Sequence, residues 1–169
     1  MKFKKIALIG MMGSGKTTIS ESLASKLNIE AIDLDNVFEK ENKIKIKDFF
    51  KEYGEEAFRK KENEILNTYL LKENIIISTG GGIILKEENR KLLFDNEVFT
   101  IYLKAKPDTI FNRIKNDKTR PLLLVDNPKK EIEKILLSRE QFYEKANLTV
   151  YTDNKTIQKI TDEICKELQ

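Results

Sequence analysis

Short apolar runs alternate with segments of helical periodicity along the chain. Five runs have the length and residue types of buried strands, and they lie at residues 6–9, 31–35, 75–78, 98–103 and 148–151. The segments between them are long enough to form helices. Strands that alternate with helices form a parallel sheet that is covered on both faces, so the pattern predicts an α/β protein.

The intervening segments predict the helices. Ile19, Leu23 and Leu27 recur at helical spacing after the first strand, and a short helix is expected around Val37. Further helices are expected at 46–72, as a pair interrupted near Gly54, at 86–95, from Pro107, at 129–145 and around 157–164. Residues 115–128 are polar or interrupted by proline, and they predict a mobile loop.

The loop after the first strand carries the clearest chemical signal. Residues 10–17 read Gly-Met-Met-Gly-Ser-Gly-Lys-Thr and match the phosphate-binding pattern G-x-x-x-x-G-K-[ST], between a strand and a helix as that motif requires. Glycines let successive N–H groups face phosphate oxygens, and the positive end of the following helix faces the same anion. The alternative is a glycine-rich turn with an incidental Lys-Thr pair.

This motif predicts ATP as a ligand, with Mg²⁺. Lys16 is expected to reach the β- and γ-phosphates, and the hydroxyl of Thr17 is expected to bind Mg²⁺. The residues expected to contact the nucleotide here are Gly13, Ser14, Gly15, Lys16, Thr17 and Thr18.

Six of the seven glycines lie either in this loop or in the triplet Gly80-Gly81-Gly82. The triplet follows the third strand directly and therefore places unhindered backbone N–H groups at the carboxyl edge of the sheet, where open α/β folds bind ligands. A flexible turn is the alternative.

Two acids end the second predicted strand. If the strand stays extended that far, Asp33 and Asp35 share one of its faces, because side chains alternate with a period of two. One could hold a water on Mg²⁺ and the other could orient a substrate hydroxyl. Asp35 could also cap the helix that contains Val37, and Asp33 could be purely structural.

Only five of the 31 basic residues are arginines. In a chain that otherwise uses lysine, each arginine is a candidate for planar, bidentate recognition of an anion. The candidates are Arg59, Arg113, Arg120 and Arg139, and Arg120 lies in the loop that could close over a phosphoryl group. Arg90 is expected to be a solvated surface residue. Phe50 and Phe58 are expected to wall a substrate site or to belong to the core.

Composition narrows the classes of function. With 169 residues, 40% hydrophobic and 35% charged, the chain predicts one soluble domain that spans residues 1–169. A net charge of +3 without a basic, aromatic-rich stripe argues against nucleic-acid binding, and no apolar segment approaches the ~20 residues that span a bilayer.

The single cysteine, Cys165, and the lack of an export signal favour the cytoplasm. Without histidine, a carboxylate is the simplest general base.

Taken in order, these residues resemble the shikimate kinases, from about residue 5 to residue 165. The resemblance rests on the phosphate loop, Asp33-x-Asp35, Phe58-Arg59 followed by Glu62, the glycine triplet, Arg120-Pro121-Leu122, and Arg139 ahead of Tyr143. It implies a three-layer P-loop NTPase fold of the nucleoside monophosphate kinase type, with a five-stranded parallel sheet in the order 2-3-1-4-5. A substrate-binding helical region at about 34–62 and a lid at about 115–127 are also implied.

The same resemblance implies the reaction and the residues that perform it. The γ-phosphoryl group of ATP would pass to the 3-hydroxyl of shikimate, a step toward the aromatic amino acids. Shikimate would be held by Asp35, Arg59, Gly81, Gly82 and Arg139. The catalytic residues would be Lys16, Asp35 and Arg120; Thr17 and Asp33 would serve Mg²⁺; and Arg113 would lie against adenine. The expected partner is this small molecule alone, bound by a monomer, with neither nucleic acid nor membrane involved.

Two alternatives remain at this point. The nearest is another small-molecule kinase on the same fold, with gluconate or a nucleotide as acceptor. The other is a nucleotide-dependent switch or binding module; guanine-specific switches carry Asn-Lys-x-Asp, and residues 154–157, Asn-Lys-Thr-Ile, lack its acid.

Overall fold

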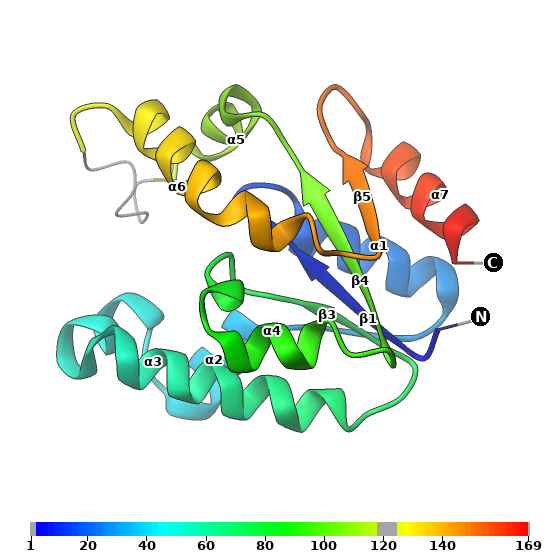
Figure 1. Cartoon of the computed structure of the whole chain (residues 1–169), viewed down its shortest axis with the longest axis horizontal. Helices are drawn as coiled ribbons and strands as arrows, with labels where there is room; N and C mark the ends of the chain where they lie inside the picture. Colours follow the sequence, from blue (N-terminus) through cyan, green and yellow to red (C-terminus); the bar gives the residue numbers. More distant parts are fainter. Residues whose placement is uncertain (1–2, 118–124, 169) are drawn as a thin grey trace.

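A five-stranded parallel sheet forms the middle layer of the protein (Figure 1). The computed structural model describes residues 3–117 and 125–168. The strands are β1 (Lys5–Ile9), β2 (Glu30–Asp33), β3 (Ile75–Ser78), β4 (Val98–Lys104) and β5 (Leu148–Tyr151). They lie in the order β2-β3-β1-β4-β5, and every neighbouring pair is parallel. Both the parallel sheet and the strand order implied by the resemblance are confirmed.

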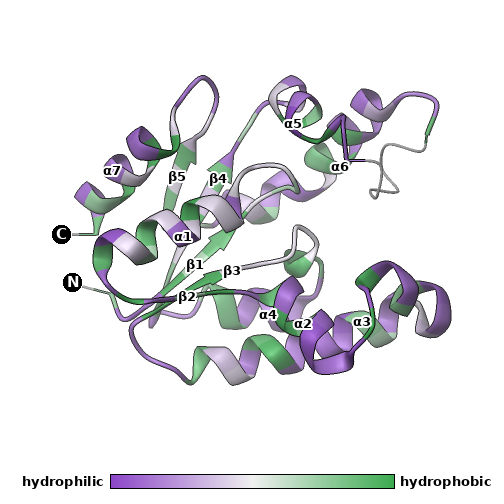
Figure 2. Ribbon diagram, turned by 180° about the vertical axis from the view of Figure 1, so that it is seen from behind, coloured by the Kyte–Doolittle hydropathy of each residue, from purple (hydrophilic) through white to green (hydrophobic). Residues whose placement is uncertain are grey.

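Helices cover both faces of the sheet. Helices α1 (Lys16–Leu27) and α7 (Ile157–Glu167) pack side by side on one face, in front of the sheet in Figure 2. Helices α2 (Leu34–Asn42), α3 (Ile46–Leu70) and α4 (Glu87–Leu93) lie on the other face, with the short 3₁₀ helix η1 (Ile83–Leu85). Helices α5 (Pro107–Ile114) and α6 (Pro128–Tyr143) pack against each other near the carboxyl end of β4.

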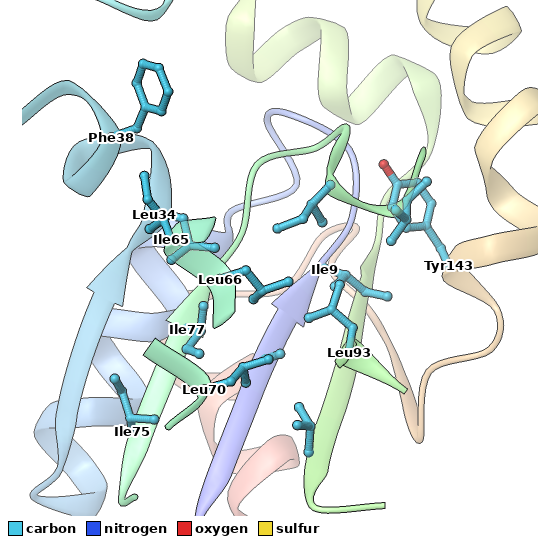
Figure 3. Packing of buried hydrophobic residues seen from close by; sticks show 14 of the residues in the cluster. Ile9, Leu34, Phe38, Ile65, Leu66, Leu70, Ile75, Ile77, Leu93 and Tyr143 are labelled. Atoms are coloured by element: carbon cyan, nitrogen blue, oxygen red, sulfur yellow. The ribbon is translucent and has the colours of Figure 1, made fainter. Parts of the chain in front are cut away.

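The central strand shows why the sequence forms this layered core. Ile6 and Leu8 of β1 point to the α1 side, whereas Ala7 and Ile9 point to the α3 side, and all four are fully buried. A strand that is buried on both faces reads as a continuous apolar run, and β3 has the same character. Figure 3 shows the α3-side cluster, in which Leu66 and Leu93 pack near Ile9 and Tyr143 lies at one edge.

The pair of helices expected at 46–72, with an interruption near Gly54, is confirmed: α3 consists of two helical segments that meet at a kink. Gly54 interrupts α3 with φ 81° and ψ 172°, which is not a helical conformation. A residue with a side chain is strained at such a positive φ, so glycine at this position permits the change of direction. The kink separates the segment that bears Phe49 from the segment that bears Phe58 and Arg59.

The prediction for the second strand was wrong at its end. We expected an extended strand through Asp35, with both acids on one face, but β2 ends at Asp33 and α2 begins at Leu34. Asp33, not Asp35, is the N-cap: its side chain accepts hydrogen bonds from the N–H groups of Asp35 and Asn36. The first N–H groups of a helix have no partner within the helix, and a capping aspartate supplies one. Asp33 is therefore both the last residue of β2 and the residue that caps the start of α2.

The carboxyl ends of the strands converge on one edge of the sheet. β1 runs into the phosphate loop, β2 ends at Asp33, and β3 runs into the glycine triplet. Because β3 lies directly between β2 and β1, these three features are neighbours at that edge. Among the helices of the described residues, none has the length and apolar character needed to cross a membrane.

Candidate active site

The phosphate loop adopts the conformation that its glycines permit. Gly13 has φ 76° and Gly15 has φ 100°, and Gly15 is the N-cap of α1. Lys16 is the first residue of α1 and is only 8% exposed. Its ammonium donates hydrogen bonds to the carbonyl oxygens of Gly10, at 2.8 Å, and Met11, at 3.0 Å, and so lies over the loop. A cation and the positive end of a helix therefore face the same cleft.

The cleft beside this loop fits the phosphates of a nucleotide. It encloses about 310 Å³ and is lined by ten residues, which include Gly13, Thr17, Thr18, Asp33, Asp35 and Gly81. The side chain of Ser14 is 1% exposed, and its Oγ has no hydrogen-bond partner within the described residues. A buried hydroxyl without a partner costs free energy, which a phosphate oxygen would offset.

Thr17 and Asp33 form a pair of oxygen donors at the rim of the cleft. Oγ1 of Thr17 donates a 2.6 Å hydrogen bond to Oδ2 of Asp33, and Oγ of Ser78 donates to the same oxygen at 2.9 Å. Mg²⁺ in phosphate sites usually takes one or two protein oxygens, waters and phosphate oxygens, so this pair fits it. No cluster of three or more histidine, cysteine or acidic residues that could hold a metal occurs at residues 3–117 and 125–168.

Asp35 lies in the first turn of α2 and opens onto the cleft. Asp35 is exposed to solvent as a residue, but the atoms around its carboxyl group limit the hydration of that group, and this desolvation is the main cause that raises its pKa above the ordinary value. The negative charge of Asp33 raises the pKa further, whereas the positive charges of Lys16 and Arg59 lower it. A carboxylate with a raised pKa is better suited to accept a proton.

Each glycine of the triplet makes room for a different part of the site. A side-chain carbon on Gly80 would lie 2.9 Å from Oε1 of Glu62 and 3.0 Å from Oδ1 of Asp35, and one on Gly82 would lie 2.4 Å from Nη2 of Arg59. A carbon on Gly81 would lie 3.0 Å from the backbone nitrogen of Met12 in the phosphate loop. None of the three has a positive φ, so close approach, and not backbone conformation, explains these glycines.

Arg59 is held by two acids on its own helix. Its Nη1 donates to Oε2 of Glu62 at 2.8 Å, and its Nε and Nη2 donate to Oε1 of Glu55 at 3.3 and 3.2 Å. Glu62 is 4% exposed, and its second oxygen, Oε1, has no hydrogen-bond partner within the described residues. Burial raises the pKa of Glu62 to about 7, against the opposing charge of Arg59.

Arg139 and Tyr143 reach the glycine triplet from α6. Nη1 of Arg139 donates to the carbonyl oxygen of Gly81 at 3.2 Å, and the hydroxyl of Tyr143 donates to the same oxygen at 2.5 Å. Because the guanidinium of Arg59 fills the space that a side chain on Gly82 would take, the two arginines approach the triplet at adjacent residues. Two guanidinium groups brought together in this way can hold a carboxylate.

Arg113 lies between the phosphate loop and the segment after β5. Nη1 donates to the carbonyl oxygens of Gly13, at 3.3 Å, and Ser14, at 3.2 Å, and Nη2 donates to the carbonyl oxygen of Thr152 at 3.0 Å. Its guanidinium therefore links the phosphate loop to the segment after β5, and its contact with adenine stays a prediction.

The other singled-out residues lie elsewhere or outside the described part. Arg120, most of the lid predicted at about 115–127 and the Arg120-Pro121-Leu122 motif fall outside the described residues. The prediction that Arg90 is solvated was wrong: its Nη1 donates to the carbonyl oxygens of Ile84 and Leu85 at 2.8 and 2.9 Å, and its guanidinium stacks on Phe142 at 4.3 Å.

The two phenylalanines belong to one aromatic cluster. Phe58 is 4% exposed, and its ring centroid lies 4.6 Å from that of Phe50 and 4.8 Å from that of Phe38. The core interpretation is thus confirmed for Phe58, while Phe50 is only partly buried.

Sequence reasoning gave no role to several residues that hold the site together. Glu62 orients Arg59, Ser78 fixes Asp33, and Tyr143 fixes Gly81. Glu62 stands three residues after Arg59, and this spacing places it on the same face of a helix, which is a signal that could have indicated the pair. Ser78 and Tyr143 make contacts between distant elements that no local spacing encodes.

Known proteins with the same features support a family assignment. The family model for shikimate kinase matches residues 12–169. A curated shikimate kinase of Enterococcus faecalis is 41% identical, over 98% of this chain and 99% of that one, and one of Bacillus cereus is 40% identical, over 98% of each.

Solved structures agree with these relatives. A structure described as shikimate kinase from Acinetobacter baumannii in complex with shikimate has a TM-score of 0.93 at 32% identity, and covers 98% of this chain and 93% of that one. The shikimate kinase of Aquifex aeolicus has a TM-score of 0.82 at 32% identity, with 97% and 95% covered. The chain therefore belongs to the shikimate kinase family.

Proposed function

We propose that this chain transfers the γ-phosphoryl group of ATP to the 3-hydroxyl of shikimate, with shikimate 3-phosphate and ADP as products. Membership of the family makes the chain an ATP-dependent kinase, and the relatives named above are shikimate kinases. The observation that carries the choice of acceptor is the glycine triplet. Acidic side chains lie close to Gly80, the phosphate loop lies close to Gly81, and an arginine lies close to Gly82.

This arrangement suits a small ring with one carboxylate and several hydroxyls. Arg59 and Arg139 would hold the carboxylate by paired hydrogen bonds, and Asp35 would orient the 3-hydroxyl. The backbone N–H groups of Gly81 and Gly82 would complete the acceptor side. A nucleotide acceptor would instead need groups that stack on its base and bind a second phosphate.

The donor side comprises the phosphate loop and its metal. Residues 13–18 would contact the phosphates of ATP, and Arg113 would lie against adenine. Thr17 and Asp33 would hold Mg²⁺, directly or through water; the ion, when bound, neutralises charge on the phosphates.

Catalysis would consist mainly of positioning and charge neutralisation, because the phosphoryl group passes through a loose transition state. Asp35 would accept the proton of the 3-hydroxyl late in the reaction, and Lys16 would stabilise negative charge on the transferred group. Arg120 is proposed to add a second cation from the lid. We also propose that the enzyme works as a cytoplasmic monomer, since ATP is plentiful there and one chain supplies every residue named above.

Identification of the product tests this proposal. The protein is incubated with ATP, Mg²⁺ and shikimate, and the mixture is followed by ³¹P NMR. A new phosphate-ester signal with coupling to the proton on carbon 3 is expected. ATP consumption without that ester, or an ester at a different hydroxyl, would contradict the proposed reaction. Asp35→Asn is the matched control, because it keeps the shape of the side chain but removes the proton acceptor.

A further inference from the structure

We propose that Tyr143 is a positioning residue for the acceptor: its hydroxyl fixes the peptide plane between Gly81 and Gly82, and so holds the glycine segment that Arg59 and Arg139 approach in the conformation that binds shikimate. This inference rests on the proposed function. It assigns a role to a tyrosine that contributes no atom to the reaction itself.

The geometry begins at the carbonyl oxygen of Gly81. This oxygen accepts hydrogen bonds from the hydroxyl of Tyr143 and from Nη1 of Arg139. Both donors lie on α6, and together they occupy both lone pairs of the oxygen. In a trans peptide the C=O of one residue and the N–H of the next point in opposite directions. The N–H of Gly82 therefore points away from α6, and Tyr143 sets that direction.

This peptide needs a restraint because glycine flanks it on both sides. Gly81 and Gly82 are glycines because the phosphate loop and Arg59 approach them closely. The lack of side chains also leaves their backbone free to populate many conformations, and a peptide between two glycines rotates more easily than any other. A hydrogen bond to its carbonyl oxygen counters this freedom.

Tyr143 is well suited to serve as that restraint. It is fully buried at the edge of the core cluster shown in Figure 3, and its ring stacks on Tyr102 with centroids 5.0 Å apart and planes 21° apart. Burial raises the pKa of its hydroxyl, so the group stays protonated and remains a donor at physiological pH. A rigid side chain of this kind loses little freedom when it makes the hydrogen bond.

A second contact ties the same end of α6 to the same segment. Phe142, the neighbour of Tyr143, stacks on Arg90, and Arg90 donates to the carbonyl oxygens of Ile84 and Leu85 in η1. With the glycine segment and α6 already joined there, loss of the Tyr143 hydroxyl should release the peptide plane and leave the packing of the helix in place.

Two variants of the aromatic stack provide a matched test. Tyr143→Phe removes the hydroxyl that contacts Gly81 and keeps the ring, whereas Tyr102→Phe removes a hydroxyl from the other ring of the stack and keeps the contact with Gly81. For Tyr143→Phe we expect the KM for shikimate to rise about three- to tenfold, the effect of one lost hydrogen bond. The KM for ATP and kcat should change less than about twofold. Tyr102→Phe should match the wild type in all three.

The readouts separate positioning from stability. Thermal melts confirm that both variants are folded at the assay temperature, and isothermal titration gives the Kd for shikimate directly. In ¹⁵N–¹H spectra, the amide signal of Gly82 should move in Tyr143→Phe and stay in place in Tyr102→Phe. An unchanged shikimate KM in Tyr143→Phe, or equal changes in both variants, would overturn the inference and leave the proposed function intact. A wild type that does not turn over shikimate would overturn both.

Discussion

Asp33 accepts a hydrogen bond from the backbone N–H of Asp35, with 3.1 Å between Oδ1 and the nitrogen. Its other oxygen, Oδ2, accepts from the hydroxyl of Thr17. One carboxylate thus joins Thr17, at the start of α1, to the first turn of α2, which carries Asp35. Asp33 caps α2, and in the proposed function it also serves Mg²⁺.

Substitution at Asp33 can separate these tasks. Asparagine caps helices about as well as aspartate but has no charge, so Asp33→Asn should keep the melting temperature within a few degrees and raise the Mg²⁺ concentration needed for half-maximal activity about tenfold. Asp33→Ala should lose the cap as well, at a cost of about 1 kcal/mol in the free energy of unfolding. Thermal melts and Mg²⁺ titrations of activity check both. An unchanged Mg²⁺ requirement in Asp33→Asn would remove Asp33 from the metal site.

Arg59→Lys tests the bidentate recognition of the carboxylate. Lysine keeps the charge, but its ammonium lacks the planar pair of N–H groups with which a guanidinium makes two parallel hydrogen bonds. The KM for shikimate should rise by about ten- to hundredfold, which corresponds to the loss of a charge-assisted hydrogen bond. Steady-state kinetics with each substrate varied in turn give the answer, and the KM for ATP serves as the internal control. Kinetics equal to the wild type would place Arg59 outside the acceptor site.

Alanine at Gly82 should act through Arg59. The added carbon would lie 2.4 Å from Nη2 of Arg59, and the end of that flexible side chain can move aside, so the fold should survive. We expect a shikimate KM raised by about tenfold with an ATP KM close to that of the wild type. Gly81→Ala is the comparison, because its added carbon would press on the backbone of Met12 and should raise the KM for ATP too. A normal shikimate KM in Gly82→Ala would show that the position of Arg59 is unimportant.

Glu62 makes stability depend on pH. Its pKa in the folded protein is about 7, above the ordinary 4.5, so the folded state binds an extra proton between these values. The resulting stabilisation is complete below about pH 4.5 and is lost as the pH rises through 7. Between pH 5 and 7.5 the wild type should lose roughly 2–3 kcal/mol of unfolding free energy relative to Glu62→Gln, which cannot ionise. Urea unfolding of both proteins at the two pH values measures the difference, and parallel pH dependence would exclude a raised pKa at Glu62.

Much of the fold could be predicted because its signals are local. The apolar runs at 75–78 and 148–151 are strands with those bounds, and Gly54 interrupts α3 where the sequence indicated. The end of β2 was not predicted correctly, because Asp33 can either continue a strand or cap a helix, and only the contacts with Thr17 and Ser78 favour the second.

The site was less predictable than the fold. The phosphate loop is contiguous, so its pattern alone indicated the donor side. The acceptor side depends on contacts between separate elements and on burial. Arg90 hydrogen-bonds to η1 and stacks on α6 instead of facing solvent, and the buried Glu62 accepts a hydrogen bond from Arg59. Such contacts join elements that lie far apart in sequence or depend on burial, which residue type alone does not reveal.

The central claim concerns the acceptor, and its most direct test is ADP release measured with a panel of acceptors. The protein is supplied with ATP and Mg²⁺, and kcat/KM is determined for shikimate, gluconate and nucleoside monophosphates, with Lys16→Ala as the control for turnover at this site. We predict a kcat/KM for shikimate that exceeds every other value by at least about a hundredfold, and loss of that activity in Lys16→Ala. Robust turnover of gluconate or a nucleotide without turnover of shikimate would contradict the account.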